Sequence, residues 1–314
     1  GGQALGGVIN LVSKRPSEAT EGEVILNATT RDGQDFSTYA STPLGNGWSG
    51  SVLVAANHHS AKDLDDDGWI DLPEYERWSV RPRLFWDGAD GTNLYLTVGA
   101  MGEDRKGGTL SGSVVPDGNP FPQNQDTDRL DGGFVLQHPI NDQLSAQVRA
   151  SAVRQQHDHV FGNLLEEDRH QTILTEASLS GDLPSASWVG GVAFQSDEYD
   201  SDTFPIHDYK YESPAAFAHF DQDFGERLTG ALSFRWDDHS EYGGELSPRM
   251  ALLFREGAWT VRGSWGRGFF APTPFLEETE AAGLSRLDPL ANLKAETAET
   301  LSLIHISEPT RLQV

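Results

Sequence analysis

The stretch from residue 144 to residue 152 reads Leu-Ser-Ala-Gln-Val-Arg-Ala-Ser-Ala, so apolar and polar residues alternate at every step. Successive side chains of a β-strand point to opposite faces of the sheet, and the stretch therefore predicts a strand with one apolar and one polar face. The same alternation recurs from about residue 21 to residue 270, for example in residues 48–57, 78–86, 94–100, 228–236 and 259–265. The chain is predicted to be all-β and antiparallel, with roughly fourteen strands of about ten residues each.

A soluble sandwich also alternates, and two details favour a transmembrane β-barrel. Aromatic residues stand at the ends of the apolar faces, as Trp78 and Trp86 do, where membrane barrels carry their aromatic girdles. The opposite faces carry residues such as Arg149 in mid-strand, which suits a water-filled interior. Pro82 argues against an uninterrupted strand at residues 78–86, because proline cannot donate a hydrogen bond to the neighbouring strand. We therefore expect a β-bulge at this position.

The connections between the predicted strands differ in length. Short turns are predicted at 31–33, 45–47, 87–91, 141–143 and 225–227, and long polar stretches at 60–74, 105–127, 161–168 and 197–207. Short turns on the periplasmic side and long loops on the exterior side are typical of outer-membrane barrels. The pattern therefore places the chain in a bacterial outer membrane.

Composition excludes several classes of function. The 314 residues contain no cysteine, which rules out disulfides and thiolate chemistry. Acidic residues outnumber basic ones by 48 to 23, giving a net charge of −25, so we expect no nucleic acid as a partner. Glycine-rich segments lack the context of a nucleotide-binding loop, and no nucleophile elbow holds a serine, so we predict that the protein is not an enzyme.

One acidic segment matches the calcium loop of an EF-hand position by position. Its predicted ligands are Asp63, Asp65, Asp67, the carbonyl of Trp69, Asp71 and Glu74. Gly68 occupies the sixth position, where the chain must turn sharply. We expect a structural Ca²⁺ ion in an exterior loop; the alternative is an acidic, solvated loop without an ion.

Histidine and arginine supply weaker candidates. His58, His59, His157, His159 and His170 are interpreted as exposed residues at the bases of loops, and binding of a transition metal or of a pH-sensitive ligand is the alternative. Five arginines are candidate charges of the barrel interior, either for an anionic ligand or for ion pairs: Arg149, Arg154, Arg235, Arg249 and Arg262.

Four segments follow one another in a recognisable order: residues 6–16, residues 246–252, residues 265–273, Trp-Gly-Arg-Gly-Phe-Phe-Ala-Pro-Thr, and residues 292–296, Asn-Leu-Lys-Ala-Glu. Together they resemble TonB-dependent outer-membrane receptors of the siderophore or cobalamin type. The first resembles the closing strand of the plug domain of that family, the second a late strand of the barrel, and the last two further segments of the barrel; Ala295 replaces the usual proline of the last segment.

The resemblance implies a division of the chain. Residues 1–16 would be the end of the plug, and residues 17–300 part of a barrel that has twenty-two strands in the family. Residues 301–314 resemble the translated read-through of a sequencing adapter and are predicted to be non-native; a genuine strand is the alternative. With strands missing, we expect an open, curved sheet that does not insert as a stable pore, because unpaired edges are not tolerated in lipid.

The resemblance also implies a function. A receptor of this family takes up a scarce, large ligand, with an iron–siderophore complex the first candidate and a cobalamin-like ligand the second. Its partners would be outer-membrane lipid and the TonB complex, the latter through an N-terminal segment. The alternative is a passive, porin-like outer-membrane channel.

Overall fold

The structure, a computed structural model, describes residues 12–275 and 283–307. Alternating residues build fifteen strands, and two 3₁₀-helices, η1 (Pro205–His207) and η2 (Leu284–Arg286), interrupt the connections. The strands are β1 (Glu21–Ala28), β2 (Gly33–Gly45), β3 (Trp48–His59), β4 (Glu74–Asp87), β5 (Asn93–Gly108), β6 (Pro122–Asn141), β7 (Leu144–Phe161), β8 (Leu164–Leu183), β9 (Ala186–Ser201), β10 (Tyr209–Phe224), β11 (Leu228–His239), β12 (Gly243–Leu246), β13 (Arg249–Glu256), β14 (Trp259–Phe270) and β15 (Glu296–Ser307).

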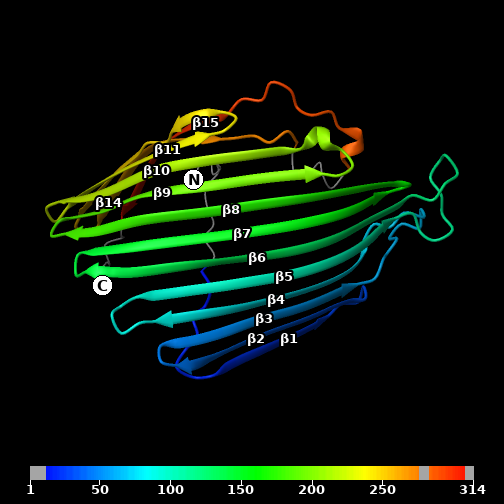
Figure 1. The fold of residues 1–314 in the computed structure, drawn as a ribbon, viewed down its shortest axis with the longest axis horizontal. Coiled ribbons are helices and arrows are strands. Elements are labelled where there is room, and N and C mark those ends of the chain that lie inside the picture. The colour runs from blue at the N-terminus through cyan, green and yellow to red at the C-terminus, as the bar shows by residue number, and fades with distance from the viewer. Residues whose placement is uncertain (1–11, 276–282, 308–314) are drawn as a thin grey trace, which may run out of the picture.

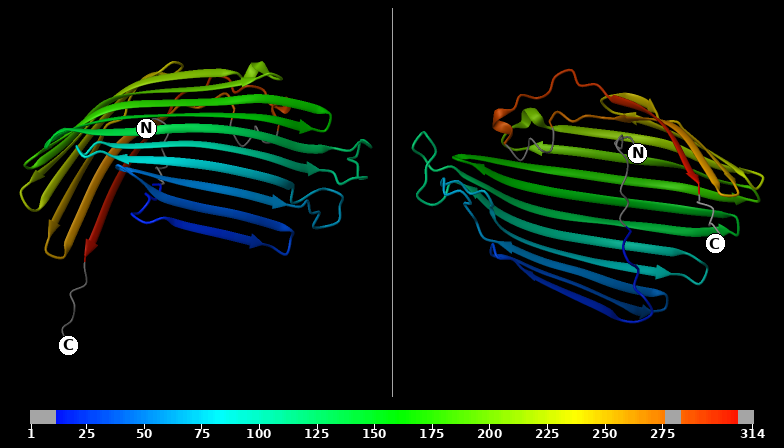
Figure 2. Two further views of the ribbon diagram at one scale, coloured as in Figure 1. Left: turned by 60° about the horizontal axis from the view of Figure 1, so that its bottom comes forward. Right: turned by 180° about the vertical axis from the view of Figure 1, so that it is seen from behind.

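All strands belong to one antiparallel sheet whose spatial order follows the chain, with β12 as a side branch on β11 (Figure 1). The sheet is strongly curved (Figure 2). Within the described residues β1 and β15 do not pair with each other, so the expected open, curved sheet is confirmed. No helix in the described residues has the length and apolar character needed to cross a membrane.

The two faces of the sheet differ in chemistry. Large apolar side chains are exposed on one face, which we call the outer face; Leu130 is 59% and Val192 60% accessible. Polar side chains such as Glu103 and Asp168 are buried on the other, inner face. The sheet thus turns its apolar side outward and its polar side inward, as predicted for a barrel wall and opposite to a soluble sandwich.

The connections separate into two ends of the sheet (Figure 1). The end that carries residues 46–47, 88–92 and 142–143 has short turns, and the opposite end, which we call the mouth, carries residues 60–73, 109–121, 271–275 and 283–295. Two details correct the sequence interpretation. The turn before β2 lies at the mouth, because consecutive hairpins of an antiparallel sheet open at opposite ends. The predicted long loop at 161–168 is only the turn Gly162-Asn163, since β7 and β8 continue almost to each other.

Pro82 does not cause the expected β-bulge. It pairs with Val52 of β3 in an uninterrupted register. The ladder between β4 and β5 stops at Val80↔Ala100 and resumes at Arg83↔Thr97 with the register unchanged. The sheet therefore accommodates the missing N–H by leaving out two pairs on one side rather than by inserting a residue.

The two ends of the chain bear on the predicted division. The predicted plug strand at residues 6–16 lies largely outside the described residues, and Val12 to Pro16 form no regular strand. Arg15 lies beside the short-turn end, where Nη1 donates to Asp87 at 2.9 Å. The tail is a strand in the structure as far as Ser307, since β15 pairs with β14 along its length. A non-native origin of this tail remains a prediction.

Candidate functional site

The predicted calcium loop connects β3 to β4 at the mouth. Its ends are joined by a bridge between Lys62 and Leu72. Two residues take the left-handed conformation that a tight turn requires, Asp66 at φ 60° and Gly68 at φ 90°. The carboxylate of Asp63 accepts hydrogen bonds at 2.8 Å from the backbone N–H groups of both residues, so the first predicted ligand also organises the turn.

The structure brings three of the six predicted ligands together. Single carboxylate oxygens of Asp63, Asp65 and Asp71 lie within 4.8 Å of one another. Asp67 instead accepts the backbone N–H of Trp69 at 2.7 Å, and Glu74 lies in β4, 3.8 Å from the ammonium group of Lys106.

The Trp69 ring stacks on Phe121, with centroids 6.1 Å apart, while its backbone forms a bridge with Thr109. An all-oxygen donor set fits Ca²⁺, and the three gathered carboxylates would supply the core of such a site.

Two carboxylates of the loop have pKa values shifted in opposite directions. The backbone N–H of Gly68 holds the pKa of Asp63 below its ordinary value. The neighbouring charge of Asp67, and then partial burial, raises the pKa of Asp65. A divalent cation between these carboxylates would remove the repulsion, because each carboxylate would then face a positive charge.

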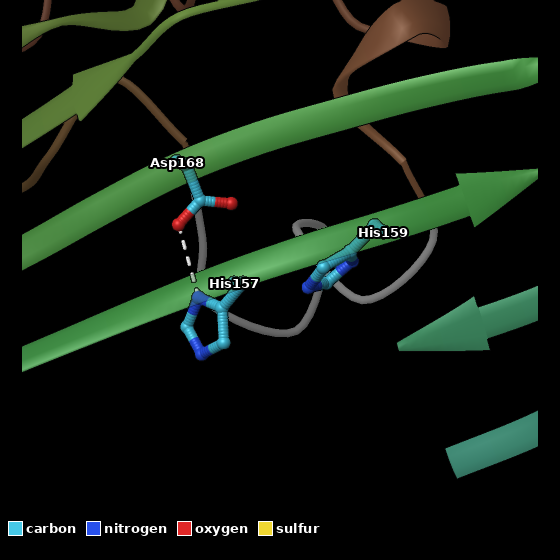
Figure 3. A group of neighbouring side chains, drawn as sticks. All are labelled: His157, His159 and Asp168. Atoms are coloured by element: carbon cyan, nitrogen blue, oxygen red, sulfur yellow. Dashed lines mark hydrogen bonds and ion pairs between the residues drawn. The ribbon is translucent and has the colours of Figure 1, made fainter. Parts of the chain in front are cut away.

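A second cluster lies on the inner face of β7 and β8 (Figure 3). His157 and His159 are two residues apart on β7 and therefore point to the same face, and Asp168 lies opposite His157 in the register of β8. Nδ1 of His157 and Oδ1 of Asp168 are 2.9 Å apart. All three residues are buried, with 4–6% of their surface accessible, which contradicts the interpretation of these histidines as exposed loop residues.

The other predicted histidines do not join this cluster. His170 is half-buried on β8 with Nε2 2.6 Å from Asp197. His59 stacks on Tyr75 with centroids 5.8 Å apart, and the neighbouring His58 lies 3.5 Å from Glu76.

The five arginines that were predicted to line the barrel interior lie on different faces of the sheet. Arg149, Arg235, Arg249 and Arg262 alternate with the exposed apolar residues of their strands and therefore face inward. Arg154 shares the outer face with Val148, so its assignment to the interior was wrong. Arg149 pairs with Glu176 and Arg235 with Asp237, each at 2.7 Å.

Sequence reasoning missed the contact that closes part of the mouth. The carboxylate of Glu166, buried on β8, accepts the backbone N–H groups of Leu284 at 2.8 Å and of Ser285 at 3.2 Å. Leu284 and Phe275 of the same connection pack with Tyr199 in the one buried apolar cluster found among the described residues. The β14–β15 connection is thus fixed to the inner face at two places. No local motif marks Glu166, because its partners lie more than a hundred residues away.

A cavity of about 670 Å³ lies at the mouth beside this contact. It lies between four segments: the acidic loop contributes Trp69, the 109–121 connection contributes Phe121, the β7–β8 turn contributes Asn163, and η2 contributes Arg286. A second cavity of about 190 Å³ is lined by His159, Arg105 and Gln125, among others, and reaches the histidine cluster. The mouth therefore has aromatic and cationic surface next to a polar interior.

Comparison with known proteins identifies the family to which this architecture belongs. Residues 47–303 match the family model described as TonB dependent receptor-like, beta-barrel. A search of curated proteins finds no match. Among solved structures, the siderophore receptor PirA from Pseudomonas aeruginosa is similar over 97% of this chain and 56% of its own, with a TM-score of 0.74 and 17% identity.

Two further receptors have the same fold. The siderophore receptor PiuA from Acinetobacter baumannii is similar over 93% of this chain and 55% of its own, with a TM-score of 0.68 and 14% identity. A variant of the ferric enterobactin receptor PfeA from Pseudomonas aeruginosa, solved with enterobactin, is similar over 87% of this chain and 48% of its own, with a TM-score of 0.71 and 14% identity. The chain spans about half the length of these structures. These proteins are receptors, not enzymes.

Proposed function

Because the chain belongs to the TonB-dependent receptor β-barrel family, we propose that it is part of a bacterial outer-membrane receptor for active uptake of a scarce, large ligand. An iron–siderophore complex is the first candidate ligand. The observation that supports this choice most directly is the cavity of about 670 Å³ at the mouth, whose aromatic rings and Arg286, with Asp117 as the carboxylate beside them, suit a bulky ligand that has both apolar and anionic groups. Two of the similar proteins are siderophore receptors, and the third is a ferric enterobactin receptor solved in complex with enterobactin.

The polar inner face supports a route for such a ligand, since buried charges there alternate with the lipid-facing apolar residues. The outer face would contact outer-membrane lipid. Energy for uptake would come from the TonB complex. A passive porin-like channel is not favoured, because the similar structures are receptors and the β14–β15 connection packs onto the inner face.

Binding of ferric enterobactin to the purified chain in detergent tests this proposal, with cyanocobalamin measured in parallel. Trp69→Ala and Arg286→Ala are each expected to weaken siderophore binding about tenfold, corresponding to ~1.4 kcal/mol. Trp259→Ala, at the short-turn end, is the matched control and is expected to bind as the unaltered chain does. Preferential binding of cyanocobalamin, or equal affinity in all variants, would contradict the proposed ligand or its site.

A structural calcium ion in the acidic loop is a second part of the proposal. Asp63, Asp65 and Asp71 would supply its carboxylate ligands, and the ion would order the loop that contributes Trp69 to the mouth cavity. An affinity on the order of 10⁻⁴ M is expected for a loop of this extracellular type. Calcium titration followed by tryptophan fluorescence measures it; no saturable change in a folded chain would count against the ion.

A further inference from the structure

We propose that His157, His159 and Asp168 form a binding site for one divalent transition-metal ion in the wall of the barrel. One nitrogen of each ring and one carboxylate oxygen lie within 4.8 Å of one another. Two imidazoles and one carboxylate are a donor set that Zn²⁺ and related ions use, often with a further position left open. The site is separate from the acidic loop, whose all-oxygen donors suit calcium.

The geometry is close to that of an occupied site. Ligands of a tetrahedral ion with bonds of about 2.1 Å lie about 3.4 Å apart. Nδ1 of His157 and Oδ1 of Asp168 are already 2.9 Å apart, and the rings of His157 and His159 meet edge to face with centroids 5.4 Å apart. The ring of His159 would have to turn toward His157 and Asp168 to complete the approach; the β7–β8 ladder fixes the backbone of all three residues.

The surroundings of the three residues supply what a metal site needs beyond its ligands. The side-chain amide nitrogen of Gln155 lies 2.6 Å from Nε2 of His157 and donates to it, so Nδ1 carries the proton that Asp168 accepts. An ion bound at Nδ1 would displace that proton, and a flip of the Gln155 amide would then let its carbonyl oxygen accept the proton on Nε2. The cavity of about 190 Å³ beside His159 provides an entry path and room for a water ligand, which occupies about 30 Å³.

The local charge also favours a cation. Asp168 is 6% accessible, and Glu166, on the same face two residues away, adds a second buried carboxylate. The nearest guanidinium on the lining of the cavity, that of Arg105, is paired with Glu103 at 3.0 Å. A divalent ion would compensate buried negative charge at the place where Glu166 holds η2.

The test is a zinc titration of the full chain in detergent after treatment with a chelator, at pH 7.5, in competition with a chromophoric zinc indicator. The expected result is one Zn²⁺ per chain. His157→Gln and His159→Gln should each weaken binding at least about 100-fold, since loss of a group that only hydrogen-bonds to a ligand already costs about 10–100-fold. His58→Gln, a change in the other histidine pair, is the control and should leave the affinity unchanged.

Substitution by Co²⁺ gives an independent readout, because its visible absorption reports nitrogen and oxygen ligands in a site of low coordination number. The absorption should be present in the unaltered chain and in His58→Gln, and absent in His159→Gln. Absence of stoichiometric binding to the folded chain, or equal affinity in all variants, would overturn the inference and leave a hydrogen-bonded network without an ion. Neither result depends on which ligand the receptor takes up.

Discussion

The acidic loop and the inner-face histidine cluster are two candidate metal sites with opposite origins. The loop is contiguous in sequence: its predicted ligands lie within residues 63–74, mostly exposed to solvent and bonded to their own backbone. The cluster comes from two strands, is buried, and exists only because Asp168 faces His157 across a ladder. The first can be recognised from residue spacing, and the second only from strand register.

The difference also predicts how tolerant each site is of substitution. Polar groups of the loop can readily exchange a lost partner for water, whereas those of the buried cluster reach water only through the small cavity beside His159. Substitutions in the cluster should therefore affect the free energy of unfolding, and those in the loop chiefly the affinity for an ion.

Asp168→Ala should have the largest effect. Removing this carboxylate leaves the buried His157 ring without its acceptor, and we expect a loss of about 2–3 kcal/mol in the free energy of unfolding, measured by denaturant titration in detergent with a chelator present. Glu176→Ala on the same strand is the control. Its pair with Arg149 is half-exposed, and about 1 kcal/mol or less is expected. An equal loss of unfolding free energy in the two variants would show that the histidine cluster contributes no more to stability than an ordinary ion pair of the inner face.

Glu166→Gln should have the next largest effect. The charged acceptor of two backbone N–H groups is replaced by a neutral one, with a cost of about 1.5 kcal/mol. The amides of Leu284 and Ser285 should exchange with deuterium roughly tenfold faster.

Glu167→Gln, on the outer face of the same strand, is the control and should leave that exchange unchanged. If the exchange at Leu284 is the same in both variants, Glu166 does not anchor η2.

Much of the fold could be predicted from period-two alternation, because each strand has one lipid-facing and one interior face. What alternation could not give is where a hairpin turns. Residues 161–168 look like a loop because Glu166, Glu167 and Asp168 are charged. In a barrel wall, however, a carboxylate can lie on the polar inner face of a strand as well as in a loop. Taking these residues as loop removed Asp168 from the strand and hid its register with His157.

In the acidic loop, residue spacing predicted the neighbours within the turn but not the position of the last ligand. Spacing identified Asp63, Asp65 and Asp71 correctly as neighbours, because a tight turn brings alternate side chains together. Glu74 was assigned by position in a helical motif, yet here the residues after the loop enter β4, where Glu74 faces Lys106. The flanking element, which the motif does not encode, decides where the last ligand points.

Asp63→Asn should weaken calcium binding roughly fivefold, since affinity in such loops depends on the number of charged ligands. Asp63 is also the acceptor of two turn-forming N–H groups, which asparagine can still serve through its carbonyl oxygen. The titration is followed by tryptophan fluorescence. Asp66→Asn removes the same charge from the same loop at a left-handed position that asparagine tolerates, and should change the affinity less. An equal change would mean that only the net charge of the loop matters.

The smallest effect is a difference in pH dependence between the two sites. The folded loop raises the pKa of Asp65 above its ordinary value of 3.8, so this group favours folding below that value and the contribution is lost as pH rises through the raised pKa. Asp63 has a lowered pKa, so its contribution is present above 3.8 and is lost as pH falls through the lowered value. Calcium requires both carboxylates ionised, and its binding should therefore weaken first where Asp65 takes up a proton.

Asp67→Asn removes the largest cause of the raised pKa of Asp65, so the acid limit of calcium binding should move to lower pH. Zinc binding at His157 and His159 should fail at a higher pH than calcium binding, because imidazole takes up a proton at a higher pH than a carboxylate does and protonated imidazole is not a ligand. Titrations of both ions at a series of pH values, followed by tryptophan fluorescence and by the zinc indicator, separate the two windows. A common acid limit for both ions would mean that they share one site, and the contrast between loop and cluster would then be wrong.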